Sequence, residues 1–222
     1  MRSFNEMNVS RWTLPFVAIL AATLYGLEWT LDSKAIAIAL KMTPALAMAL
    51  HLLILKRLIA WPMIAALALH AAGDAFLDLG KPFLLAGIGA FFLGHFGYIA
   101  AFLPHRRRWS ELGIGTKVTI IAVILTMTTL NLVIWPKMPG ILAIAAPIYA
   151  AVLTTMTITA LLGKWNGPWV TLGALLFIFS DVLIGLRMFQ GEKTLAFLIW
   201  PTYAAAQVMI PVGWLNTVLE GE

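Results

Sequence analysis

Eight apolar runs follow one another along the chain with only short breaks between them, and this pattern constrains the fold more than any other feature. An α-helix needs about 20 mostly apolar residues to cross the hydrocarbon core of a bilayer. At that length, transmembrane helices are predicted near residues 12–28, 36–55, 58–77, 82–103, 117–135, 140–162, 168–188 and 195–217. No break could hold a soluble domain. The sequence therefore predicts one all-α domain over residues 1–222, a polytopic membrane helix bundle with eight transmembrane helices.

The composition agrees with a membrane environment. Apolar residues make up 61% of the chain and charged residues 11%, and the mean hydropathy is +0.91, whereas a soluble domain carries about 25% charged residues. A net charge of +5 raises the question of nucleic acid. The basic residues lie in short loops between apolar runs, so no nucleic-acid binding is expected. No small-residue cleavage site follows the first apolar run, so we expect that helix to stay in the membrane.

The distribution of basic residues predicts the orientation. If the N-terminus is cytoplasmic, nine bases lie in cytoplasmic segments and four on the opposite side. The nine are Arg2, Arg11, Lys56, Arg57, Arg106, Arg107, Arg108, Lys117 and Lys164, and the four are Lys34, Lys81, Lys137 and Lys193. Because cytoplasmic loops are enriched in Lys and Arg, both chain ends are predicted to be cytoplasmic. In a bacterium this would be the cytoplasmic membrane.

A weak internal repeat is also predicted. Gly73-Asp74 is followed by Tyr98, and Ser180-Asp181 is followed by Tyr203, with Asp-to-Tyr spacings of 24 and 22 residues. Two four-helix halves with the same topology would place both aspartates at similar depth.

Polar side chains inside the predicted spans are the candidate functional residues. An ionisable group at mid-helix costs about 2.5–3.5 kcal/mol on insertion scales and faces the bundle interior or a water-filled cavity. The candidates are Lys41, Asp74, His95, Tyr98, Asp181, Tyr203 and Gln207. They share helix faces with small residues, which leave room for a neighbouring helix or a ligand. We expect them to meet in one pocket toward the extracytoplasmic side.

Structural interpretations remain open for these residues. Asp74 could be a solvated residue at the rim of the bundle, and Lys41 could extend to the membrane surface. The histidine, tyrosine and glutamine side chains could simply join neighbouring helices by hydrogen bonds. His51 and His70 are expected to be structural.

Several catalytic templates are absent from the sequence. The chain has no cysteine, no Gly-x-Ser-x-Gly elbow and no His-Glu-x-x-His motif. Gly113 and Gly115 lack the rest of a dinucleotide fingerprint. Neither a metal site nor a cofactor is therefore expected, and the two intramembrane aspartates remain.

These aspartates lie in segments that resemble the YhhN family, which includes the lysoplasmalogenases. The resemblance rests on Gly73-Asp74-Ala75-Phe76-Leu77, on Phe92–Phe102 and on Gly173–Asp181. It extends to Lys41-Met42-Thr43-Pro44 and to Tyr203-Ala204-Ala205-Ala206-Gln207. In the family the Lys-Pro segment is commonly tighter, so the role of Lys41 stays open. The resemblance covers nearly the whole chain and implies an eight-helix membrane protein.

The resemblance also implies an activity, the hydrolysis of the vinyl-ether bond of lysoplasmalogens to a fatty aldehyde and a glycerophospho-base. The expected partner is therefore a lysophospholipid substrate, within membrane lipid. Protonation of the alkene gives an oxocarbenium ion, so the site needs a protonated acid and a negative charge. Asp74 and Asp181 are predicted to supply them, as two carboxylates do in glycosidases. Which of the two carries the proton stays open.

The other five candidates, namely Lys41, His95, Tyr98, Tyr203 and Gln207, are predicted to bind the substrate, with Lys41 at its phosphate. Two rival functions stay open. Paired intramembrane aspartates with a lysine also suit a small proton-coupled transporter or a lipid-handling protein. The aspartates could instead only join helices in a structural or sensor protein.

Overall fold

The computed structural model describes residues 4–28, 32–55 and 60–220, and these are almost entirely helical. The α-helices are α1 (Phe4–Gly26), α2 (Lys34–Ile54), α3 (Trp61–Leu79), α4 (Leu84–Phe102), α5 (Ile114–Ile134), α6 (Leu142–Leu162), α7 (Trp169–Gln190) and α8 (Ile199–Glu220). Single 3-10 turns occupy Lys81–Phe83, Leu103–His105, Trp109–Glu111, Trp135–Lys137 and Ala196–Leu198. The described residues contain no β-strand, so the all-α prediction is confirmed.

Each predicted span overlaps one of these helices, but the first helix differs from its prediction. Seven helices, α2 to α8, are long and apolar enough to cross a membrane. In α1 the apolar part is only Trp12–Gly26, about 22 Å at 1.5 Å per residue, against a hydrocarbon core of about 30 Å. Polar residues such as Asn5 and Glu6 form its first turns. The eighth transmembrane span, the cytoplasmic placement of both chain ends and the four-plus-four repeat therefore stay predictions.

A glycine ends each of the two helices that carry Asp74 and Asp181. After α3, Gly80 has φ of 111°, and after α7, Gly191 has φ of 74°. A residue with a Cβ is strained at such angles, and glycine is the usual choice. The chain then turns sharply and enters α4 or α8, so α3–α4 and α7–α8 form two antiparallel hairpins.

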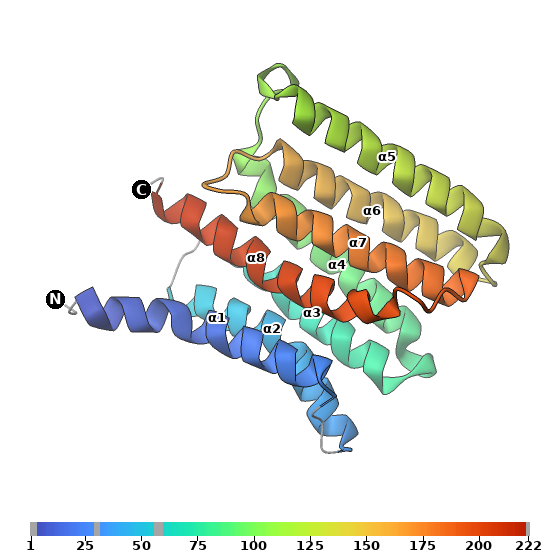
Figure 1. Ribbon diagram of the computed structural model, residues 1–222, viewed down its shortest axis with the longest axis horizontal. Coiled ribbons are helices and arrows are strands. Elements are labelled where there is room, and N and C mark those ends of the chain that lie inside the picture. Colours follow the sequence, from blue (N-terminus) through green and yellow to red (C-terminus); the bar gives the residue numbers. More distant parts are fainter. Residues whose placement is uncertain (1–3, 29–31, 56–59, 221–222) are drawn as a thin grey trace.

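The helices lie side by side as one bundle (Figure 1). The described start of α1 and the end of α8 lie at one end of the bundle. The turns α3–α4 and α7–α8 lie at the other, which we call the hairpin end. The hairpin α7–α8 packs tightly, α4 packs on α6, and α8 contacts both α1 and α2. By contrast, α5 is the least buried of the seven helices α2 to α8 and lies at the edge of the bundle.

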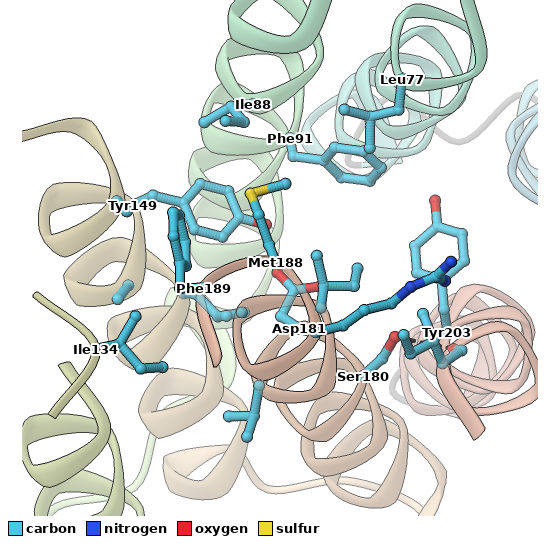
Figure 2. Close-up of a pocket in the computed structure, with 18 of the residues that line it drawn as sticks. Leu77, Ile88, Phe91, Ile134, Tyr149, Ser180, Asp181, Met188, Phe189 and Tyr203 are labelled. Carbon is cyan, nitrogen blue, oxygen red and sulfur yellow. Dashed lines mark hydrogen bonds between the residues drawn. The ribbon is translucent and has the colours of Figure 1, made fainter. Parts of the chain in front are cut away.

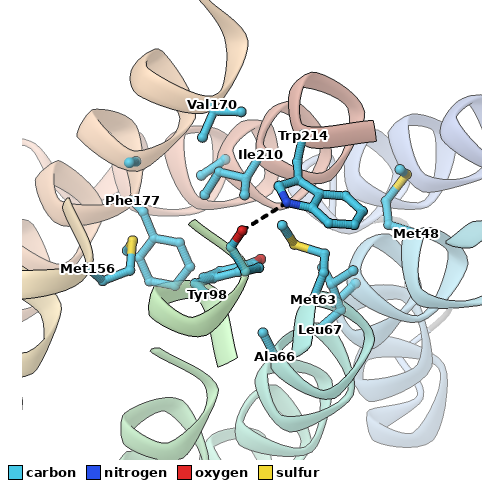
Figure 3. Packing of buried hydrophobic residues seen from close by; sticks show 14 of the residues in the cluster. Met48, Met63, Ala66, Leu67, Tyr98, Met156, Val170, Phe177, Ile210 and Trp214 are labelled. Carbon is cyan, nitrogen blue, oxygen red and sulfur yellow. Dashed lines mark hydrogen bonds between the residues drawn. The ribbon is translucent and has the colours of Figure 1, made fainter. Parts of the chain in front are cut away.

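The core lies between α3, α4, α7 and α8. Figure 3 shows Tyr98, Phe177 and Trp214 packed with Met63 and Ile210. The indole N–H of Trp214 is buried and donates to the carbonyl oxygen of Ala101 at 3.1 Å, which joins α8 to α4. A buried indole needs such a partner.

Glycine permits the close approach of the helices in each hairpin. A Cβ at Gly97 would lie 2.7 Å from the carbonyl oxygen of Pro62, and one at Gly213 would lie 2.8 Å from the amide nitrogen of Val170. Small residues at such contacts are typical of membrane helices, because they bring two backbones together. This approach fixes α3 against α4 and α7 against α8, and thereby fixes the two aspartates.

Candidate active site

A cavity of about 360 Å³ lies in the half of the bundle nearest the hairpin end, in the size range of small-molecule sites. All eight helices contribute to its lining. Most of the lining is aliphatic or aromatic, including Ile88, Phe91, Ile134 and Met188. Figure 2 shows Tyr149, Asp181 and Tyr203 around this cavity. Such a lining suits a hydrocarbon chain, and its few polar groups would orient the polar end of a ligand.

Both aspartates line this cavity. Asp74 is five residues from the end of α3 and is buried, with 2% of its surface exposed. Asp181 is nine residues from the end of α7 and is half-buried. The structure therefore brings two acidic groups from separate hairpins to one cavity, as a two-carboxylate reaction requires.

Asp74 is held by a chain of buried hydrogen bonds. The Tyr203 hydroxyl donates to Asp74 Oδ2 at 2.7 Å, and Gln207 Nε2 donates to the Tyr203 hydroxyl at 2.7 Å. The Tyr98 hydroxyl then donates to Gln207 Oε1 at 2.8 Å. Tyr98 and Gln207 are fully buried and do not line the cavity. They support Tyr203 from behind instead of facing a ligand.

Asp181 has a separate and shorter chain of hydrogen bonds. The Tyr149 hydroxyl donates to Asp181 Oδ2. His95 Nε2 lies 3.1 Å from the same hydroxyl. The imidazole of His95 is fully buried and, like Tyr98 and Gln207, does not line the cavity. Its position behind Tyr149 means that it reaches Asp181 only through the tyrosine.

The family follows from comparison with known proteins. The model of the YhhN family matches residues 36–214. The chain belongs to the YhhN family. With its seven long apolar helices, this YhhN protein is therefore a multi-pass integral membrane protein.

Two curated relatives are similar to this YhhN protein, and both bear the name lysoplasmalogenase. They come from Mycobacterium bovis and Mycobacterium tuberculosis, and each is 34% identical over 158 residues. The match covers 68% of this chain and 59% of each relative, so the chain spans about three fifths of the length of the curated relatives. No solved structure matches.

Lys41 lines the same cavity and is already paired. Its Nζ lies 2.6 Å from Asp78 Oδ1 in an ion pair. The Tyr25 hydroxyl donates to Asp78 Oδ2 at 3.4 Å, and Lys41 Nζ lies 5.8 Å from the centroid of the Tyr25 ring. The predicted contact of Lys41 with a phosphate would thus have to compete with Asp78.

Ser180, beside Asp181, has a structural contact. Its hydroxyl donates to the carbonyl oxygen of Ile199 at 2.9 Å and ties α7 to the start of α8. His70 is fully buried behind the cavity, where its ring lies 4.9 Å from that of Tyr98 and 5.2 Å from that of His95, between ring centroids. Within the described residues, no group of three His, Asp or Glu side chains could hold a metal ion.

The sequence reasoning missed three residues of this site. Tyr149 contacts both Asp181 and His95, Asp78 pairs with Lys41, and Arg187 lines the cavity. A signal for Tyr149 existed, because the chain has only four tyrosines and all four lie in or behind the cavity. A tyrosine hydroxyl buried in an apolar helix needs a hydrogen-bond partner. Asp78 and Arg187 gave no such signal, since charges near a helix end are ordinary.

Proposed function

We propose that the protein is a lysoplasmalogenase-like membrane hydrolase that cleaves the vinyl-ether bond of lysoplasmalogens. One observation carries the proposal: two aspartates from separate hairpins line one largely apolar cavity, and each is held by a tyrosine hydroxyl. The curated relatives named lysoplasmalogenase support the same activity. The amphiphilic substrate suits a cavity with an aliphatic lining and polar groups near one end of the bundle.

In the proposed reaction, Asp181 is the general acid. The proton moves from its carboxyl group to the alkene carbon that does not bear oxygen, and the adjacent carbon becomes part of an oxocarbenium ion. Asp74, as a carboxylate, stabilises this cation by its negative charge. Water adds to the cationic carbon, its proton passes to Asp74, and a hemiacetal forms.

The hemiacetal then collapses to the products. Its bond to the glycerol oxygen breaks, and Asp74 returns the proton to that oxygen. The hydroxyl proton of the hemiacetal passes to Asp181 as the aldehyde forms. The acid and the carboxylate thereby regain their starting states, and one water is consumed.

The hydrogen-bond chains support this assignment of the two aspartates. Tyr98 has one hydroxyl hydrogen, and Gln207 Oε1 is its acceptor within the described residues. The NH₂ end of Gln207 must then face Tyr203 and donate to its hydroxyl oxygen. The hydroxyl hydrogen of Tyr203 therefore points to Asp74. A carboxyl oxygen that accepts in this way suits a carboxylate, the state in which Asp74 begins the proposed reaction.

Asp181, by contrast, has surroundings that suit both of its protonation states. When His95 Nε2 carries a hydrogen, it donates to Tyr149, and Tyr149 donates to an Asp181 carboxylate. When Nε2 is bare, Tyr149 donates to His95 and accepts from a protonated Asp181. If Nε2 stays bare, the Tyr149 hydrogen turns from His95 to Asp181 when the carboxyl proton leaves and turns back when that proton returns, so the hydroxyl stays paired throughout.

Purified protein in detergent micelles tests the activity. We expect a lysoplasmenyl lipid to release a fatty aldehyde, detected by mass spectrometry, and the matched 1-alkyl ether lipid to stay intact. In D₂O, rapidly trapped aldehyde should carry one deuterium on the carbon next to the carbonyl. Aldehyde without that deuterium would contradict protonation at carbon. No aldehyde from any lysoplasmenyl lipid would contradict the proposed activity.

A further inference from the structure

Arg187 is a positive charge in the cavity that the reaction above does not use. It lies on α7, six residues after Asp181, and its side chain lines the cavity. Among the side chains that the structure describes, the one salt bridge joins Lys41 to Asp78, and Arg187 has no acidic partner. The Arg187 side chain is exposed in the last turn of α7 and also lines the cavity, so its unpaired guanidinium is accessible to the anionic group of a ligand that enters there.

The position of Arg187 matches the geometry of a glycerophospholipid. Six residues along α7 separate it from Asp181, about 9 Å along the helix axis at 1.5 Å per residue. In the substrate, seven bonds separate the alkene carbon to be protonated from the phosphorus atom. An extended chain of seven bonds spans about 8 to 9 Å, at the roughly 1.2 Å per bond of an extended backbone. A lipid that places its alkene at Asp181 can therefore place its phosphate at the level of Arg187.

Lys41 is the other basic residue of the cavity and suits this task less well. Its ammonium group is already neutralised by Asp78 at 2.6 Å, so binding a phosphate would leave that carboxylate without its partner. Among the described residues the guanidinium of Arg187 has no acidic partner, and its planar fork matches two phosphate oxygens at once.

We propose that Arg187 binds the phosphate group of the lipid ligand and so sets the position of the bond to be cleaved. This inference rests on the proposed function for the register of the substrate. Lys41 and Asp78 then form a neutral pair beside the head group, and Arg187 on α7 makes the site prefer ligands that carry a phosphate.

The binding of two uncleavable ligands tests the inference without any turnover. One is a 1-alkyl lysophosphatidylethanolamine, and the other is the matching 1-alkylglycerol, which lacks the phosphate. We expect wild-type protein in detergent to bind the phospholipid more tightly. Arg187→Gln should weaken the phospholipid about 10- to 100-fold, as expected for lost hydrogen bonds to a charged group. Binding of the alkylglycerol should stay the same, which also shows that the variant is folded.

Three further variants sharpen the test. Lys193→Gln removes an exposed charge beyond the end of the same helix and should change neither affinity. Arg187→Lys should restore part of the preference, because it keeps a point charge without the fork. If Arg187→Gln does not bind alkylglycerol, Arg187→Met, with a comparable aliphatic stem, takes its place. Three results would overturn the inference. Wild-type protein could show no preference for the phospholipid, the preference could remain in Arg187→Gln, or it could be lost in Lys41→Gln instead.

This design separates the two proposals. Aldehyde release with a phosphate preference that ignores Arg187 would leave the hydrolase standing and remove the role of Arg187. A phosphate preference that depends on Arg187, with no aldehyde from any vinyl ether, would support the role of Arg187 and contradict the proposed hydrolase activity.

Discussion

Replacing Tyr149 by Phe removes one hydroxyl group and tests whether the hydrogen bond to Asp181 acts in the reaction. The aromatic ring stays, so the packing around His95 and Asp181 is retained. The lost hydrogen bond joins a hydroxyl to an acidic group, and such bonds contribute about 1.5–3 kcal/mol. Because each 1.36 kcal/mol of activation free energy is tenfold in rate, kcat for aldehyde release should fall about 10- to 100-fold. KM should change less, since Tyr149 is not placed at the head group.

The matched control is Tyr25→Phe, which removes another hydroxyl from the lining of the same cavity. The Tyr25 hydroxyl donates to Asp78 over a long 3.4 Å and reaches neither proposed catalytic aspartate, so kcat should fall less than about threefold. Thermal unfolding in detergent should accompany both assays, because His95 loses a buried partner in Tyr149→Phe. Wild-type kcat in Tyr149→Phe, or equal losses in both variants, would refute the role of the tyrosine.

Two further predictions concern the fold and its orientation. Gly97→Ala should lower the midpoint of thermal unfolding, because its Cβ would meet the Pro62 carbonyl at 2.7 Å, while Gly89→Ala in the same helix meets nothing within 4 Å and should be neutral or stabilising. A Gly97→Ala variant as stable as Gly89→Ala would contradict the close packing of α3 on α4. Reporter fusions after Arg108 should read cytoplasmic and those after Gly80 extracytoplasmic. A cytoplasmic signal at Gly80 would reverse the predicted orientation.

The helices could be predicted from sequence because apolar length and breaks such as Gly80 act locally. A run of about 20 apolar residues forms one helix whatever its neighbours are, and Gly80 and Gly191 end their helices through their own backbone angles. The first helix was the exception. Its polar first turns carry no hydropathy signal, so the helix begins at Phe4, eight residues before the predicted transmembrane span, whose start coincides with the apolar part at Trp12.

The candidate site was only partly predictable, because depth in a helix does not give the direction of a side chain. The polar positions Asp74, Asp181 and Tyr203 were identified by their cost in a membrane, and the structure places them at one cavity. His95 and Gln207 gave the same signal but lie behind that cavity as partners of tyrosines. In the sequence, a polar residue in an apolar helix gives the same signal whether it contacts a ligand or another side chain.

Asp78 and Arg187 belong to the site but were not predicted as site residues. Both lie within the last turns of their helices, where charged residues are ordinary membrane-surface anchors. Only the packing of α2 beside α3 pairs Asp78 with Lys41, and only the position of α7 places Arg187 at the cavity. The sequence holds no local signal for either relation, because each depends on two helices that meet after folding.

The most direct test of the central claim is aldehyde release from a lysoplasmenyl lipid by Asp74→Asn and Asp181→Asn, measured beside thermal unfolding. Asparagine keeps the shape and accepts the tyrosine hydrogen bond, but it can neither protonate carbon nor carry negative charge. Loss of a general acid costs about 10²–10⁴-fold, and loss of the charge opposite the cation should cost a similar factor. We therefore predict that kcat falls at least about 100-fold in each variant while both stay folded. Wild-type rates in either variant would contradict the two-aspartate mechanism.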